Sequence, residues 1–67
     1  MLIIKLLPTS FIVSGLSDEY AAKICGPCEV KPYELKPGVQ GHRVKGKPNH
    51  MYALLLELSC TFDIELT

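Results

Sequence analysis

The sequence predicts a small α+β domain, in which an antiparallel or mixed sheet of about four strands carries one helix on one face in the order β(β)αββ. Three observations predict it: an apolar run at the N-terminus, a short helix with start and stop signals, and a long period-two pattern near the C-terminus. A chain of 67 residues is expected to form a single domain, residues 1–67. Domains of this size bury only about 60% of their unfolded surface, so a partner, a metal or a disulfide is an expected source of extra stability.

The first fourteen residues are expected to lie in the middle of the sheet. Leu2–Leu7 is almost entirely apolar, with Lys5 as its only charge, and Pro8 ends the run. Phe11–Val13 follows after a short turn-like segment. Apolar runs of this length predict two central strands or one kinked strand.

A helix is predicted from Asp18 to Cys25. Ser17 is suited to accept hydrogen bonds from the free N–H groups of the first turn, and Asp18 and Glu19 lie at the positive end of the helix dipole. The Gly-Pro pair after Cys25 ends the helix, because proline cannot continue it.

The middle of the chain predicts an edge strand followed by an irregular segment. In Cys28–Leu35, apolar residues alternate with charged or polar ones. The segment also contains Pro32, which has no N–H to donate to a neighbouring strand and is therefore expected only in an edge strand. Residues 36–50 contain three glycines and two prolines. They are predicted to form an irregular basic loop, or a hairpin folded around Lys45–Lys47.

The segment Tyr52–Leu66 has the clearest pattern in the chain. Apolar residues occupy every even position, at Tyr52, Leu54, Leu56, Leu58, Cys60, Phe62, Ile64 and Leu66. A period of two predicts a strand, so we expect one long bent strand or two strands that meet near Ser59.

This long strand predicts a homodimer. A helix of eight residues covers roughly 12 Å of sheet, whereas fifteen strand residues extend about 50 Å. Part of the apolar stripe is then left uncovered, and a second copy of the chain is the simplest surface to cover it. The expected dimer interface is Phe62, Ile64 and Leu66.

Charge is balanced overall but unevenly spread. Seven Lys and Arg residues match seven Asp and Glu residues, which argues against a protein that coats nucleic acid. Residues 36–50 nevertheless contain only cations, whereas residues 51–67 contain only acids. The expected partner-binding residues are Lys36, His42, Arg43, Lys45 and Lys47.

The cysteines allow two alternatives. Cys25 and Cys28, together with His42 and His50, have the residue types of a tetrahedral zinc site, which would make the chain a zinc-stabilised nucleic-acid-binding module that uses the 36–50 loop. The string from Cys25 to Cys28 also resembles the redox motif of thioredoxins, and that resemblance implies a thiol–disulfide redox protein. In thioredoxins the motif opens a helix, whereas here the predicted helix precedes it. We therefore expect neither a resident cofactor nor a metal, with the cysteines serving as small apolar residues at a helix end.

The function expected from the sequence is binding rather than catalysis. No nucleophile elbow, phosphate loop or paired-carboxylate motif is present, and the odd number of cysteines favours a reducing, cytoplasmic compartment. No run approaches the ~18 apolar residues of a membrane span. The leading hypothesis is a small non-enzymatic protein-interaction module, of the type used by phage and mobile-element accessory proteins that bind and inhibit a host protein.

Overall fold

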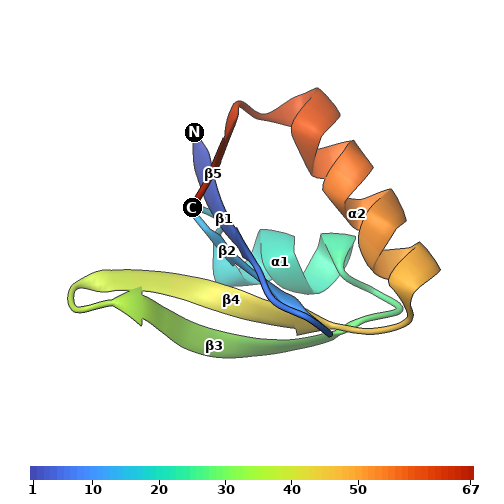
Figure 1. The fold of residues 1–67 in the computed structure, drawn as a ribbon, viewed down its shortest axis with the longest axis horizontal. Coiled ribbons are helices and arrows are strands. Elements are labelled where there is room, and N and C mark those ends of the chain that lie inside the picture. The colour runs from blue at the N-terminus through green and yellow to red at the C-terminus, as the bar shows by residue number, and fades with distance from the viewer.

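The computed structural model describes residues 1–67 and contains one five-stranded mixed sheet and two helices (Figure 1). In chain order the elements are β1 (Leu2–Leu6), β2 (Phe11–Ser14), α1 (Asp18–Ile24), β3 (Glu29–Lys36), β4 (Val39–Lys45), α2 (Pro48–Thr61) and β5 (Ile64–Leu66). The strand order across the sheet is β3-β4-β2-β1-β5, and β1 and β5 are the one parallel pair.

The α+β class is confirmed, and so are the elements of the first half of the chain. β1 and β2 are interior strands, and β3, which contains Pro32, lies at an edge of the sheet. α1 begins where the sequence predicts, because the Tyr20 N–H donates a hydrogen bond of 3.2 Å to the Ser17 Oγ. Cys25 is the C-cap residue of this helix. The sheet has one strand more than expected, and a second helix accompanies α1.

The prediction of a long strand over Tyr52–Leu66 is wrong, because most of this segment is the helix α2. Pro48 occupies the first turn, where its missing N–H costs nothing. A second apolar pattern, at helical spacings of three and four, decides the outcome: the residues turned toward the sheet are Met51, Leu54, Leu55, Leu58 and Phe62. The same segment therefore contains both patterns, the alternation at even positions and the helical spacing. Only its last three residues, Ile64–Leu66, form a strand.

The prediction for residues 36–50 is also wrong, both as an irregular loop and as a hairpin folded around Lys45–Lys47. The chain turns at Pro37 and Gly38, where Gly38 has a φ of +85°, and β4 then pairs with β3 on one side and β2 on the other. Gly41 lies within β4, at a point where β4 approaches β2 closely. A Cβ at this position would lie 2.9 Å from the Val13 carbonyl oxygen, which explains why the residue is a glycine. The glycine content therefore reflects one tight turn and one close approach of strands. Only the short link after Lys45 is irregular.

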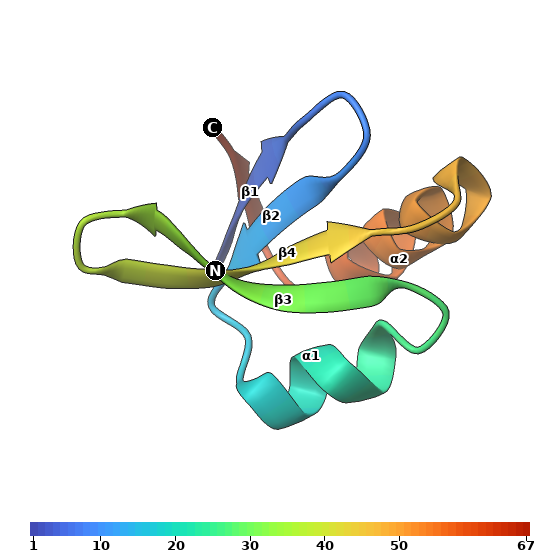
Figure 2. The ribbon, with the colours of Figure 1, turned by 90° about the horizontal axis from the view of Figure 1, so that it is seen from below.

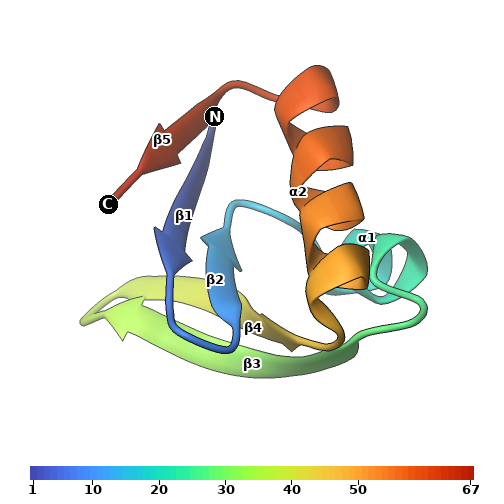
Figure 3. The same ribbon diagram turned by 45° about the vertical axis from the view of Figure 1, so that its right-hand side comes forward.

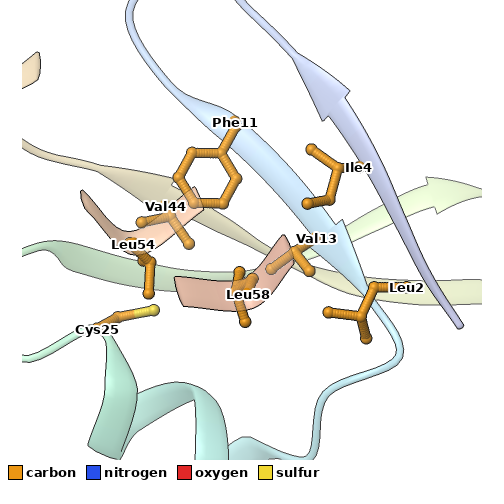
Figure 4. Close-up of a cluster of buried hydrophobic side chains, with 8 residues drawn as sticks. All are labelled: Leu2, Ile4, Phe11, Val13, Cys25, Val44, Leu54 and Leu58. Carbon is orange, nitrogen blue, oxygen red and sulfur yellow. The ribbon is translucent and has the colours of Figure 1, made fainter. Parts of the chain in front are cut away.

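The hydrophobic core lies between the two helices and one face of the sheet. Figure 4 shows eight buried side chains that converge from β1, β2, β4, the end of α1 and the length of α2: Leu2, Ile4, Phe11, Val13, Cys25, Val44, Leu54 and Leu58. Both helices therefore cover the same face, and Figure 3 shows them on the same side of β1 and β2. The opposite face of the sheet has no covering element.

The sequence argument for a homodimer loses its premise in this fold. The fifteen-residue strand that one helix could not cover does not exist, because α2 buries its own stripe. Phe62 packs within the chain, with its ring 5.8 Å from that of Tyr20 at 89°. Ile64 packs against the core, and of the three expected interface residues only Leu66 is exposed.

We predict that Leu58→Ala lowers the free energy of unfolding by about 2–5 kcal/mol, whereas Leu56→Ala changes it by less than about 1 kcal/mol. The Leu58 side chain is fully buried and Leu56 is 49% exposed, although a strand would turn both to the same side. Urea denaturation followed by circular dichroism measures both values. Equal losses in the two variants would contradict the helical assignment of this segment.

Candidate functional site

The uncovered face of the sheet brings basic side chains from three strands together. The strand register pairs Lys5 with Ile12, Ile12 with Arg43, and Arg43 with Lys31. Residues directly opposite each other on paired strands project from the same face, so these four form one row across the sheet. Adjacent strands are about 4.8 Å apart, and the row therefore spans roughly 14 Å of backbone.

Two further residues of the same strands extend this row. Lys45 lies two residues beyond Arg43 on β4, and Tyr33 lies two residues beyond Lys31 on β3, so both project from the uncovered face. The basic sheet face is defined here as Lys5, Lys31, Tyr33, Arg43 and Lys45. Figure 2 shows β3 and β4 running side by side into a hairpin that extends beyond the other strands.

Ile12 is the buried apolar residue at the centre of the basic sheet face. Its side chain is only 1% exposed, yet it lies outside the core cluster on the other side of the sheet. Because Lys5 and Arg43 are its cross-strand neighbours, their aliphatic stems are positioned to cover it while their charged ends stay in water. The cations are thereby held over a buried strand.

The charges of this face act on one carboxylate, that of Glu29. The Lys31 Nζ lies 3.0 Å from the Glu29 Oε1, and this hydrogen bond, with the Lys31 charge, lowers the pKa of Glu29. The charges of Lys45, its cross-strand partner, and of Arg43 lower the same pKa further. The ion pair is exposed and adds little stability.

Most of the positive charge on this face remains available to a ligand. Arg43 makes one side-chain hydrogen bond, from its Nε to the Ser10 Oγ at 3.4 Å, which leaves both Nη groups free. Lys5, Arg43 and Lys45 form no salt bridge. The strands therefore position the charged groups of Lys5, Arg43 and Lys45, and these groups keep N–H donors that are free to bind a ligand.

The structure separates the five residues that the sequence predicts to bind a partner. Arg43 and Lys45 lie on the basic sheet face. Lys36 pairs with Val39 beyond the bulge in β3, so it projects from the same side of the sheet but at the hairpin turn, and Lys47 is the N-cap residue of α2. His42 projects to the opposite face. Lys5 and Lys31, which the sequence analysis missed, join Arg43 only through the strand register. The alternation within Cys28–Leu35 was the one signal that placed Lys31 and Tyr33 on a common face.

His42 is bound within the fold and is not free to contact a partner. Its side chain is buried beneath the start of α1, with Nε2 2.7 Å from the Asp18 Oδ1. The Nδ1 atom is buried without a hydrogen-bond partner. The position of His42 reflects the alternation of β4, which turns Arg43 to the open face and its neighbours to the core side.

The four residues of the alternative zinc site are not gathered together. Cys25, Cys28 and His50 line one pocket at the end of α1, while His42 lines another beside Asp18. No group of three or more His, Cys, Asp or Glu side chains has the arrangement that a metal ion requires.

The cysteine pair also lacks the electrostatics of a thiol catalyst. All three cysteines are free thiols. Burial, with a smaller contribution from the nearby Cys28, raises the pKa of Cys25 to about 11. Reactive thiols have a lowered pKa, so the structure favours packing as the role of Cys25.

Comparisons with protein-family models, with curated proteins and with solved structures gave no significant match. Neither helix has the length and apolar character needed to cross a bilayer. The function is therefore inferred from the surfaces of the chain itself.

We predict that the three cysteines differ strongly in their rate of alkylation. At pH 8 only about one Cys25 thiol in a thousand is ionised in the folded chain, while Cys60 is exposed on α2. Iodoacetamide at pH 8 is expected to modify Cys60 first and to spare Cys25, as measured by mass spectrometry of peptides. Modification of Cys25 before Cys60 would contradict the packing role and favour the redox alternative.

Proposed function

We propose that the chain is a small non-enzymatic protein-interaction module that binds an acidic protein surface through the basic sheet face. One observation carries the proposal: Lys5, Lys31, Arg43 and Lys45 project from a sheet face that neither helix covers. We further propose that it acts as an accessory protein of a phage or mobile element that inhibits a host protein.

A rigid platform favours this function. The four cations are held by neighbouring strands, and Ile12 beneath them is buried, so little backbone ordering is required when a partner docks. Opposite charges on the partner would steer association and set its orientation.

The composition of the face favours a protein over a nucleic acid. Proteins that bind single strands combine several stacking aromatic residues with a marked positive charge. Here Tyr33 is the one exposed aromatic residue on the face, and Glu29 lies among the cations. The chain as a whole has a net charge of zero. A nucleic acid is therefore the second candidate and an outcome of the test below.

The test compares the wild-type chain with two double variants that remove the same number of charges. The site variant carries Arg43→Gln and Lys45→Gln. The control variant carries Lys23→Gln and Lys47→Gln, which lie on α1 and at the start of α2, away from the basic sheet face. Glutamine is chosen because glutamate would place additional carboxylates around Glu29.

Each form is immobilised and used to capture proteins from a lysate of the cells that naturally make it, with and without nuclease. We expect wild type and control to retain a common protein that the site variant loses. Calorimetry with that purified protein should show at least about tenfold weaker binding by the site variant, which is a loss of about 1.4 kcal/mol. Thermal unfolding should be nearly equal in all three forms, because exposed charges contribute little to stability.

Two results would contradict the proposal. Equal affinity of the site and control variants would show that the basic sheet face does not take part in binding. Loss of the captured material after nuclease treatment would favour the nucleic-acid alternative.

A further inference from the structure

A second surface lies on the helix-covered side of the sheet, at the edge formed by β5. It is an apolar groove of about 380 Å³ lined by residues of α2, β1 and β5. Figure 3 shows how these three elements are arranged. Seven of its eight lining residues are hydrophobic: Ile4, Leu6, Tyr52, Leu55, Leu56, Ile64 and Leu66, with Ser59 as the eighth. This surface is called the β5 groove below.

The β5 groove collects most of the exposed apolar surface of the chain. Six large hydrophobic side chains are exposed, and four of them line it: Leu6 (56%), Tyr52 (65%), Leu56 (49%) and Leu66 (67%). Scattered exposed hydrophobic residues are ordinary, whereas a contiguous group marks a binding surface.

The backbone beside the groove is open to a further strand. The Leu2 N–H donates to the Asp63 carbonyl at 2.8 Å, and the Thr67 N–H donates to the Ile4 carbonyl at 3.0 Å. Alternate residues of a strand direct their backbone groups to opposite edges, so the N–H and C=O groups of Ile64 and Leu66 face the free edge of the sheet. An unpaired edge of this kind is a template for strand addition.

We propose that the β5 groove binds an extended segment of a partner protein in which apolar and basic residues alternate. A strand added beside β5 directs every second side chain into the groove, toward Tyr52, Leu56 and Leu66. The remaining side chains project from the other face, next to Glu65, which shares that face with its register partner Ile3. Glu65 lies on β5 and Asp63 directly precedes it, and residues 48–67 contain neither Lys nor Arg, so charge complementarity selects a basic segment.

The same geometry disfavours a second copy of the chain. A two-fold antiparallel pairing of β5 centred on Glu65 sets this carboxylate against its own copy, and one centred on Ile64 sets Asp63 against Glu65. Like charges directly opposite each other destabilise a pair of strands. The four half-exposed side chains offer on the order of 400 Å², whereas stable dimers bury roughly 800 Å² per partner.

The probe is a capped seven-residue peptide that alternates lysine and isoleucine, titrated into the ¹⁵N-labelled chain. We expect the amide resonances of Ile64, Glu65 and Leu66 to shift, with a dissociation constant below about 1 mM. A matched peptide with glutamate in place of lysine should bind at least about tenfold more weakly. The variant Glu65→Lys should reverse this preference.

Two tyrosines provide a matched pair of variants. Tyr52→Ser removes a side chain of the β5 groove. It is expected to weaken binding of the lysine peptide at least about fivefold, or about 1 kcal/mol. Tyr33→Ser removes an exposed aromatic ring from the opposite face and should leave the affinity unchanged. Both rings are solvent-exposed, so both variants are expected to fold.

Three results would overturn the proposal. One is the absence of shifts at β5 with the lysine peptide at millimolar concentration, and another is equal affinity for the lysine and glutamate peptides. The third is a dimer in sedimentation equilibrium that Tyr52→Ser dissociates, because this would show that a second copy occupies the β5 groove.

Discussion

Burial of the α2 leucines against the central strands is the interaction on which the rest of the structure depends. Leu54 and Leu58 pack on the same side of the sheet as Leu2, Phe11 and Val44, and Figure 4 shows these side chains meeting at the centre of the molecule. Each fully buried leucine contributes about 1.5–3 kcal/mol. Because small domains have net stabilities of only about 5–15 kcal/mol, these two residues are a large share of the total.

One-sided burial also determines where ligands can bind. Both helices cover the same face, so the cations on the opposite face stay solvated. The helix α2 is about 21 Å long at 1.5 Å per residue. It buries the central strands but leaves the apolar side chains beside β5 partly exposed. The two proposed binding surfaces are therefore consequences of a single packing arrangement.

The zero net charge of the chain conceals a separation that the sheet creates. The strand register gathers cations on the basic sheet face, where even the pKa of Glu29 responds to three of them. β5, which contains Glu65 and directly follows Asp63, forms the opposite edge of the sheet beside the β5 groove. Partners of different chemistry can accordingly be distinguished by one small domain.

The sequence by itself determined the elements whose signals are local. Ser17 and the Gly-Pro pair after Cys25 delimit α1, the apolar run at the N-terminus gives interior strands, and Pro32 confines β3 to an edge, because capping and missing N–H groups act within a few residues. The tertiary structure decided between the two periodicities of Tyr52–Leu66, since both apolar stripes exist and only packing on the sheet selects the helical one. It also decided the candidate site: Lys5, Lys31 and Arg43 are far apart in the chain, and only strand register, a long-range property, sets them side by side.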